Sequence, residues 1–578
     1  MKLYHWIILL FSIAVSVFLG FQGIRWGIPS EEKADLVLSQ ELHNEHFYQL
    51  MKHSREEIYN FSGGSPIGRL KNFHSSLPPV LRSIGIKENE NLFFDGDEKI
   101  LSNFIRPYLL RSNHTDEQMT ISALAGMHPR SFDFNPRMFP YGGVYIYSMG
   151  AFLGISHVLG YIRIRSDLNY YLKQPQEMGK IFTAGRFYNI FFLVPCLVFL
   201  FLSANLNNSF RAGLFALIFF AFSPALIFQV HIMKPYIMAT FFGIMCIYFS
   251  QRLLTGGSLE IILAGVSAGL SAGAMPVYGF IIIIPLIAIL NERKALKRNM
   301  AYVIAAAGLT FIITNPYWII NISSVIREYA GTKTMYFSGH SLKSAAVIFT
   351  KQLLINIPSS FLIFTLFSLV YLLKFGKRDD RVLSAGIVIS SLLFAFILRE
   401  QQVSPHISRF LLLHIAMCSI LCGRMAAILF DNNSTKTAAL LIFSIIMFHT
   451  SSMASMTVNN FILDGTENST RIKAGRWIMK NIPPGAEIAL EEMPEPAHVP
   501  PFAFSKYKIT VMRGMPLKKM PEYVILINKN LSDTDLENFI SNYRPVVVFR
   551  PVNSALGINY GIWNSHINSE IKIFKRLI

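Results

Sequence analysis

Long apolar runs, separated by short polar connections, fill the middle of this chain. An α-helix needs about 20 apolar residues to cross the hydrocarbon core of a bilayer. Lipid offers no water to the backbone, so each such run predicts a membrane-spanning helix. The pattern therefore predicts an all-α membrane protein with about 11 (11–13) transmembrane helices. The eleven runs are 3–24, 185–206, 212–231, 237–253, 258–275, 277–291, 300–320, 352–374, 382–399, 409–430 and 436–455.

A twelfth apolar run, 143–161, decides the predicted orientation, because tyrosine, glycine, serine and histidine interrupt it. The positive-inside rule places the basic loops 293–298 and 374–381 in the cytoplasm. With Lys2 also inside, both loops fall inside only if 143–161 lies along the outer leaflet and does not cross. The alternative is that 143–161 spans the membrane and the N-terminus lies outside.

The first of these topologies places two long segments, 25–184 and 456–578, on the outer face. Tyr145 and Tyr147 then lie at headgroup depth, where aromatic residues of interfacial helices are common. The run 3–24 is interpreted as an uncleaved first span, because no small-residue cleavage site closes it.

The chain divides by this pattern into four parts. They are the first span (1–24), a large outer loop with interfacial helices (25–184), the helix bundle (185–455) and a small C-terminal α/β domain (456–578). In the last part, a helical pattern ends at Pro483-Pro484-Gly485 and strand-like runs follow. The predicted helix is 471–482, and the predicted strands are 487–490, 523–527 and 545–549.

Composition agrees with a membrane protein, since 52% of the residues are hydrophobic and only 15% are charged. A soluble protein carries about 25% charged residues. The net charge of +18 is explained by basic residues in short cytoplasmic loops, which face anionic lipid headgroups. No nucleic-acid-binding motif is present. All four cysteines lie in apolar runs, which argues against a disulfide framework or a zinc site of the usual spacing.

The segment 111–147 carries the clearest chemistry. Asp116 and Glu117 open a helix-like stretch, Asp133 follows, and an Asn135-Pro136 turn leads into the tyrosine-rich run. A carboxylate at the outer surface can accept a proton from a hydroxyl nucleophile whose reaction partner is anchored in lipid. The alternative is that Asp116 and Glu117 only cap and charge a helix N-terminus.

The same segment resembles signatures of the GT-C-fold membrane glycosyltransferases, which include protein O-mannosyltransferases and lipid A aminoarabinose transferases. His114-Thr115-Asp116-Glu117 is similar to their His-Pro-Asp-Glu sequence, and Asn135-Pro136 through Tyr147 is similar to their second patch. This sequence departs from the pattern at Thr115 and at Gly142-Gly143. Looser matches are Arg186, Ser223-Pro224, Lys234-Pro235, Gly269 to Gly273, Asn315-Pro316-Tyr317 and Arg471 to Ala486.

The resemblance implies a GT-C-like fold and an inverting transfer of a sugar from a polyprenyl-phosphate donor to an acceptor hydroxyl on the outer face. Asp116 is the candidate base, Glu117 would orient the acceptor or the base, and Asp133 is a second candidate. The partners implied are the lipid-linked donor, membrane lipids and an acceptor that is lipid, glycan or protein. The location implied is the inner (plasma) membrane.

The leaving phosphate needs cationic stabilisation at the outer membrane surface. Lys234 and Arg409 are favoured, although ionisable residues at span ends often only snorkel. A divalent metal is an open option, with His114, Asp116, Glu117 and Asp133 as ligands, although nothing in their spacing demands one. The full set of candidate substrate-binding residues is His114, Asn135, Arg137, Tyr141, Lys234, Arg399, His406 and Arg409.

Three other functions fit the same general pattern. A transporter or flippase for a lipid-linked glycan is one, but such proteins show internal repeats and charges at mid-membrane, which this sequence lacks. A non-catalytic assembly subunit is another, and it would tolerate loss of Asp116. The third is an enzyme that moves a whole glycan instead of a single sugar.

Overall fold

A computed structural model of the protein describes residues 3–61, 91–206, 209–254, 258–292, 295–336, 342–397, 408–512, 520–528, 542–555, 558–559 and 567–577. The chain forms two compact units. We call the first the helical unit; it comprises residues 1–22, 134–152 and 186–457. The second, which we call the mixed unit, comprises 23–133, 153–185 and 458–578.

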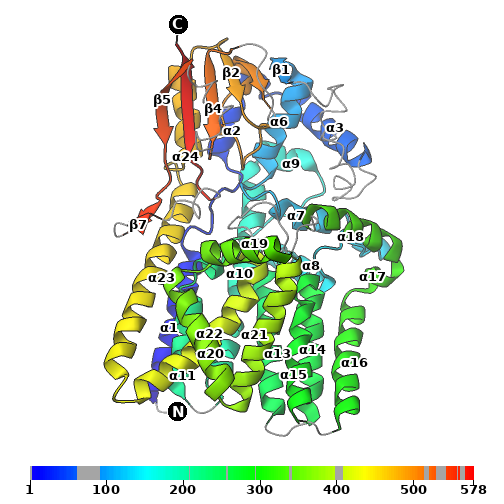
Figure 1. Ribbon diagram of the computed structural model, residues 1–578. Helices are drawn as coiled ribbons and strands as arrows, with labels where there is room; N and C mark the ends of the chain where they lie inside the picture. Colours follow the sequence, from blue (N-terminus) through cyan, green and yellow to red (C-terminus); the bar gives the residue numbers. More distant parts are fainter. Residues whose placement is uncertain are drawn as a thin grey trace. The chain divides into compact units, whose positions relative to one another are not determined.

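The helical unit is a bundle in which α13, α14 and α16 run side by side (Figure 1). The helical unit shares three helices with the mixed unit, to which the ends of α8 and α23 and the start of α10 belong. Its helices are α1 (Leu3–Phe21), α8 (Gly143–Val158), α10 (Pro175–Ala204), α11 (Phe210–Ala221), α12 (Pro224–Val230), α13 (Tyr236–Leu253), α14 (Ser258–Ala274), η3 (Pro276–Ile282), α15 (Ile283–Glu292), α16 (Leu296–Thr314), α17 (Pro316–Ile320), α18 (Ile322–Tyr336), α19 (Leu342–Asn356), α20 (Ser359–Phe375), α21 (Arg378–Ile397), α22 (Ser408–Asp431) and α23 (Lys436–Asp464).

The predicted apolar runs fall on helices, several of them on two in succession, and the chain is a multi-pass membrane protein. The count of eleven spans is not confirmed: five described helices are long and apolar enough to cross a membrane, or seven if two bent pairs each count as one span. The run 143–161 forms α8, which has 16 residues and is not among these candidates in the described chain.

Two prolines account for the bent pairs. Helices α11 and α12 meet at 63°, and Pro224 is the first residue of α12. Helices α19 and α20 meet at 118°, and Pro358 directly precedes α20. Proline lacks an N–H and disfavours helical backbone in the residue before it, so both helices stop there. The predicted spans 212–231 and 352–374 are therefore each divided between two helices that meet at an angle.

Small residues explain the close packing of α14 on α16. A side-chain carbon added to Gly265 would lie 2.6 Å from the carbonyl oxygen of Val303. One added to Gly269 would lie 2.5 Å from the carbonyl oxygen of Ala307. Glycines four residues apart let two helix backbones touch, as is common between membrane helices.

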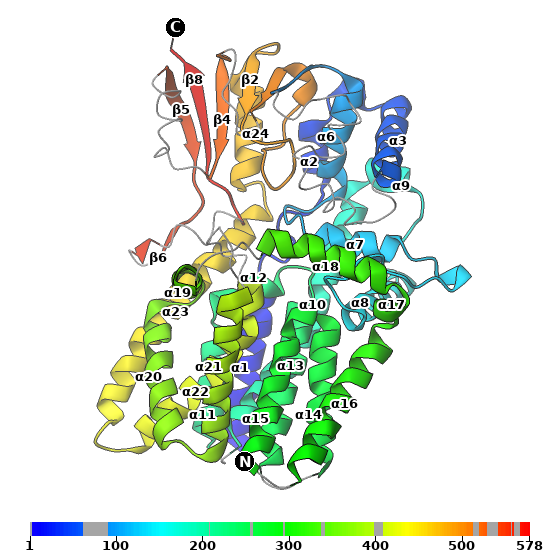
Figure 2. The same cartoon turned by 45° about the vertical axis from the view of Figure 1, so that its right-hand side comes forward.

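The mixed unit combines short helices with a six-stranded sheet, drawn with its strands side by side in Figure 2. Its elements are α2 (Glu31–Val37), η1 (Gln40–Leu42), α3 (Glu45–Phe61), β1 (Leu92–Asp95), α6 (Glu98–Leu110), α7 (Glu117–Ala125), η2 (Pro129–Ser131), α9 (Leu168–Lys173), α24 (Thr470–Asn481), β2 (Glu487–Leu490), η5 (Phe504–Lys506), β3 (Lys508–Val511), β4 (Tyr523–Ile527), β5 (Tyr543–Phe549), β6 (Ser554–Ala555), β7 (Ile558–Asn559) and β8 (Ile571–Arg576).

The sheet has the strand order β1-β3-β2-β4-β8-β5. Strands β3, β2 and β4 are parallel, and the other pairs are antiparallel. Helix α24 and strands β2, β4 and β5 match the predicted helix and three strands closely, whereas β3 and β8 were not predicted. Strand β1 comes from the first long loop and pairs with β3, so both ends of the chain build one sheet.

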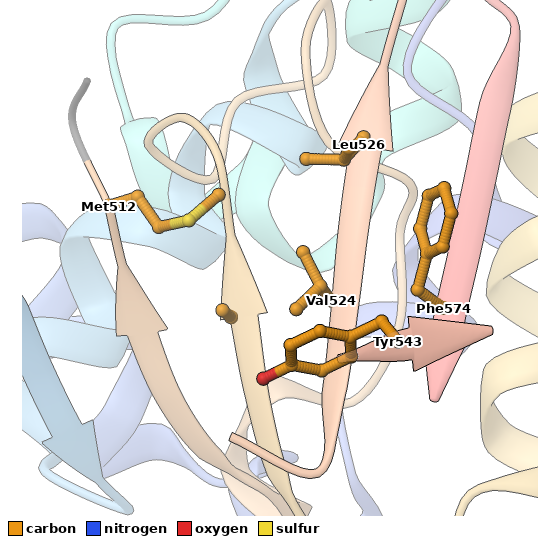
Figure 3. Close-up of a cluster of buried hydrophobic side chains, with 6 residues drawn as sticks. Met512, Val524, Leu526, Tyr543 and Phe574 are labelled. Carbon is orange, nitrogen blue, oxygen red and sulfur yellow. The ribbon is translucent and has the colours of Figure 1, made fainter. Parts of the chain in front are cut away.

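One face of this sheet carries an apolar cluster. Val524 and Leu526 of β4 lie between Met512 and Phe574, and Tyr543 packs beside them (Figure 3). The alternation of these residues along β4 is the period of two that places side chains on one face of a strand. Burial of this face stabilises the sheet, which carries α24 and the segments around it.

Candidate functional site

The predicted acidic segment lies in the mixed unit, where α7 begins. Glu117 is completely buried and accepts a hydrogen bond of 2.5 Å from the Ser112 hydroxyl. Asp116 occupies the N-cap position of α7, but its side chain makes no capping hydrogen bond. Its backbone is already helical, with φ −73° and ψ −19°, whereas a capping residue usually has extended backbone. The geometry therefore gives Asp116 no capping role and leaves its carboxylate partly exposed.

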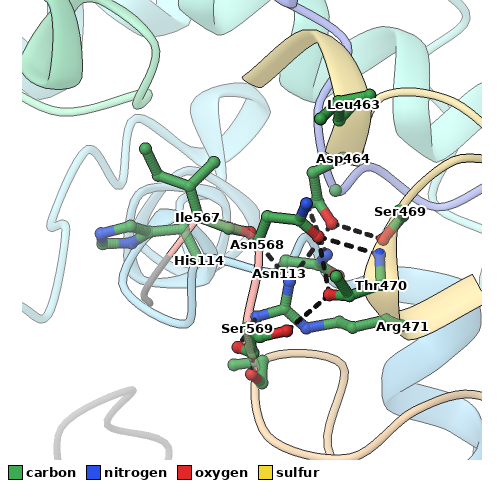
Figure 4. A network of polar contacts seen from close by, with 12 residues as sticks. Asn113, His114, Leu463, Asp464, Ser469, Thr470, Arg471, Ile567, Asn568 and Ser569 are labelled. Atoms are coloured by element: carbon green, nitrogen blue, oxygen red, sulfur yellow. Dashed lines mark hydrogen bonds and ion pairs between the residues drawn. The ribbon is translucent and has the colours of Figure 1, made fainter. Parts of the chain in front are cut away.

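A buried polar network holds the residues just before Asp116 (Figure 4). Asn113 donates to the Asp464 carboxylate over 2.9 Å and accepts from the Lys33 ammonium over 2.9 Å. Lys33 also donates to the carbonyl oxygen of Gly27. This network fixes the backbone that leads into His114 and Asp116.

Arg471 ties the same network to the C-terminal part of the mixed unit. Its guanidinium pairs with Asp464 over 3.2 Å, and both side chains are almost fully buried. Asp464 also accepts from the Ser469 hydroxyl over 2.6 Å. The remaining acceptors of Arg471 are the carbonyl oxygens of Ile567 and Ala497 and the Ser569 hydroxyl. Sequence reasoning used Arg471 only as a family match and missed Asp464 and Lys33, because nothing along the chain pairs them.

Asp133 closes a small turn in the mixed unit. Its backbone pairs with that of His128 in an isolated β-bridge, with N–H to carbonyl distances of 2.8 and 3.2 Å. Between them lies η2, and Phe132 adopts a left-handed conformation with φ of 57°. The Asp133 side chain is partly exposed.

The helical unit places Lys234 beside two tyrosines. Lys234 is only 2% exposed, and its ammonium lies 5.2 Å from the ring centre of Tyr141 and 5.7 Å from that of Tyr236. Both distances are within the range of a cation–π interaction. Tyr141 belongs to the predicted motif, so the structure brings together two of the predicted substrate-binding residues.

Arg409 joins this group through Phe410. The Phe410 ring packs edge-on against Tyr236, with 6.4 Å between ring centres. The Arg409 guanidinium carbon lies 4.8 Å from the centre of the Phe410 ring. The backbone of Arg409 is fixed because Tyr278 donates to its carbonyl oxygen over 2.6 Å. We call Tyr141, Lys234, Tyr236, Arg409 and Phe410 the cation–aromatic cluster.

Asn135 and Arg137 shape the loop before Tyr141. Arg137 has a left-handed backbone with φ of 50°, which is uncommon for a residue other than glycine. Asn135 supports this conformation, because its side-chain oxygen accepts from the Arg137 N–H over 3.0 Å. The Arg137 side chain also donates to the carbonyl oxygen of Asn135.

The departure from the family pattern at Gly142-Gly143 has a steric explanation. A side-chain carbon on Gly142 would lie 1.9 Å from the carbonyl oxygen of Gly273, and one on Gly143 would lie 2.2 Å from that of Thr314. The Gly143 N–H donates to the side-chain oxygen of Asn315 over 2.6 Å. Three of the motifs noted in the sequence therefore meet here, where α8 starts and α14 and α16 end.

Glu328 of α18 was not predicted from the sequence. Both oxygens of its carboxyl group accept from the Phe139 N–H, over 3.3 and 3.2 Å. Burial raises the pKa of Glu328 to about 8, and the hydrogen bond from Phe139 offsets part of this effect. The only sequence signal nearby was the Asn315-Pro316-Tyr317 match.

Other predicted residues have different outcomes. Arg399 and His406 lie outside the described residues. Within the described chain, no group of three His, Cys, Asp or Glu residues could hold a metal ion. His114, Asp116, Glu117 and Asp133 thus do not form such a group.

Comparison with protein-family models and with curated protein sequences gave no match. By structure, the chain is similar to an oligosaccharyltransferase of Archaeoglobus fulgidus solved with Zn and sulfate, at 14% identity and a TM-score of 0.38, covering 60% of this chain and 47% of that one. Another structure of this archaeal enzyme, AglB with an inhibitory peptide and a dolichol-phosphate, gives 12% identity and a TM-score of 0.41 over 98% and 75% of the two chains.

The chain is also similar to ArnT from Cupriavidus metallidurans bound to undecaprenyl phosphate, at 9% identity and a TM-score of 0.41 over 81% and 95%. In the alignment with the oligosaccharyltransferase solved with Zn and sulfate, the chain spans about half the length of that protein. The oligosaccharyltransferase and ArnT are of the GT-C class that the sequence resemblance named. The likeness concerns the fold.

Proposed function

We propose that this protein is a membrane glycosyltransferase that moves a sugar from a polyprenyl-phosphate donor to an acceptor hydroxyl on the outer face of the membrane. The observation that carries the proposal is the burial of Lys234 between the rings of Tyr141 and Tyr236. A cation removed from water attracts an anion more strongly than an exposed one does. The phosphate of a lipid-linked donor is an anion of the right chemistry.

The leaving group of this reaction is the lipid phosphate, which takes up negative charge as the sugar departs. Lys234 and Arg409 are proposed to stabilise that charge, because both belong to the cation–aromatic cluster. Charge stabilisation by fixed donors is commonly the largest single contribution to catalysis. The tyrosine and phenylalanine rings would also exclude water from the phosphate.

Asp116 is proposed as the base. Its carboxylate takes the proton of the acceptor hydroxyl, and the acceptor oxygen forms a bond to the anomeric carbon. The bond between that carbon and the phosphate oxygen breaks, and the electron pair leaves with the lipid phosphate. Configuration at the anomeric carbon inverts. The support for Asp116 is its place at the start of α7, on a backbone fixed by the Asn113 network.

The test is a transfer assay with the protein in nanodiscs, a panel of radiolabelled polyprenyl-phosphate sugars and a membrane lipid and glycan extract. We expect label to leave the donor with wild type, and Asp116→Asn to lower the rate by about 10²- to 10⁴-fold, the usual contribution of a general base. Asp97→Asn is the matched control, since Asp97 is an exposed helix cap that bonds the backbone of Lys99. It should change the rate less than about twofold.

Two outcomes would contradict parts of the proposal. Transfer that survives Asp116→Asn would keep the class of enzyme and move the base to Asp133. Retained binding of the lipid-linked sugar without transfer, for every donor tried, would reject the enzyme and favour a transporter or an assembly subunit.

A further inference from the structure

One segment of the helical unit holds the motif loop at several points. The segment is 315–329, which includes α17 and the first half of α18, and the motif loop is 134–143. The bonds come from four different side chains. They are Phe134 N–H to the Tyr317 hydroxyl (3.1 Å), Phe139 N–H to the Glu328 carboxyl (3.2 and 3.3 Å), the Tyr329 hydroxyl to the Phe139 carbonyl (3.4 Å) and Gly143 N–H to the Asn315 side chain (2.6 Å).

Phe139 is the centre of this arrangement, because Glu328 and Tyr329 bind both polar groups of its backbone. Its own side chain is buried, and that of the neighbouring Met138 is completely buried. A buried backbone N–H must find an acceptor, and leaving it unpaired costs about 1–3 kcal/mol.

The loop that these bonds restrain also contains a strained residue and a functional one. Arg137, with φ of 50°, lies two residues before Phe139. Tyr141, whose ring lies against the Lys234 ammonium, lies two residues after it. A shift of the Phe139 backbone would therefore move the ring that covers Lys234.

We infer that Glu328 is a positioning residue, which fixes the Phe139 backbone from α18 and thereby sets the place of Tyr141 against Lys234. This inference rests on the proposed function, in which Lys234 binds the lipid phosphate. Tyr329 and Tyr317 assist by holding the Phe139 carbonyl and the Phe134 N–H. Glu328 itself acts through the loop and is not assigned any contact with the substrate.

The raised pKa of Glu328 agrees with this role, since a carboxyl group with a pKa of about 8 is mostly protonated at neutral pH. In that form its carbonyl oxygen still accepts the hydrogen bond from the Phe139 N–H. Among the described side chains, Tyr317 of α17, Arg327 and Tyr329 of α18, and Arg137 of the loop are ionisable groups on the neighbouring elements. A glutamine would reproduce the neutral acceptor.

The experiment compares wild type, Glu328→Ala and Glu328→Gln in nanodiscs. Hydrogen exchange of peptides covering 134–143 reports the loop, binding of undecaprenyl phosphate reports the cation–aromatic cluster, and the transfer assay gives kcat and KM. We expect Glu328→Ala to speed exchange at least about tenfold, and to weaken both phosphate binding and kcat/KM by roughly 10- to 100-fold, as misplacement by about 1 Å does. Glu328→Gln should stay within about threefold of wild type in all three measurements.

The matched control is Arg327→Ala, because Arg327 lies next to Glu328 on α18 and its exposed side chain bonds Ser323 and Ser324 of the same helix. It should leave exchange of 134–143 unchanged. Unchanged exchange or binding in Glu328→Ala, or a loss in Glu328→Gln as large as that in Glu328→Ala, would overturn the inference. If wild type neither binds undecaprenyl phosphate nor transfers sugar, the proposed function is rejected, and the functional part of this inference is rejected with it. The exchange result would still decide whether Glu328 fixes the loop.

Discussion

The mixed unit and the helical unit both bury a cationic side chain, but they surround it differently. Arg471 of the mixed unit meets a carboxylate, two backbone carbonyls and a hydroxyl. Lys234 of the helical unit lies against the faces of two tyrosine rings. The carboxylate and the hydrogen-bond acceptors around Arg471 make a structural link. The rings beside Lys234 suit the exclusion of water from an anionic ligand.

The largest effect should come from breaking the compensated pair. Arg471→Ala leaves the completely buried Asp464 without its cation. Removing one partner of a buried ion pair typically costs about 3–5 kcal/mol. We expect the free energy of unfolding of the mixed unit to fall by about that much, measured by urea-dependent proteolysis in detergent. Arg476→Ala is the control, since its pairs with Glu32 and Glu467 are exposed and are worth less than about 1 kcal/mol. Equal losses in the two variants would show that the Arg471 network is not a structural link.

The next effect tests the other half of the comparison. Lys234→Met removes the cation and keeps a side chain of similar length. We expect kcat/KM for transfer to fall by about 10²- to 10³-fold, as loss of one charge-stabilising donor usually does. The free energy of unfolding should fall by less than the roughly 3–5 kcal/mol expected for Arg471→Ala, because methionine keeps packing against the rings. A loss of stability comparable to that of Arg471→Ala would instead make Lys234 a structural link like Arg471.

Much of the helical unit could be predicted, because the hydrocarbon core requires long apolar runs and these are visible in the sequence. The bends near Pro224 and Pro358 were not predicted, since hydropathy does not report the direction of a helix, and 212–231 and 352–374 were each predicted as one span. In the sheet, β2, β4 and β5 were predicted as strands from local β-branched runs. The pairing of β1 with β3 was not, because contacts between residues about 400 positions apart leave no local pattern.

The candidate site could be predicted only in part, for the same reason. Tyr141 and Lys234 were both chosen from their motifs, but their contact depends on how α8 meets the loop before α13. Glu328 and Asp464 were missed, since each is an ordinary acidic residue in its own segment and gains its role from a distant partner. Gly142-Gly143 was noted as a departure from the family, and only the close backbones of Gly273 and Thr314 explain it.

The smallest effect concerns Glu328, a buried acid whose raised pKa predicts a pH dependence of stability. An unfolded glutamate titrates near 4.5, and the folded one near 8. The folded state therefore holds the proton more tightly, so wild type loses stability relative to Glu328→Gln as the pH rises from about 4.5 to about 8, and loses no more above that. Because Glu328 is partly exposed, we expect the total change to be on the order of 1–3 kcal/mol. Thermal unfolding of the two proteins at about pH 5, 7 and 9 should show the difference in stability between them widening as the pH rises. A constant gap would mean that Glu328 is already ionised at pH 5, and the neutral acceptor assigned to Phe139 would then be wrong.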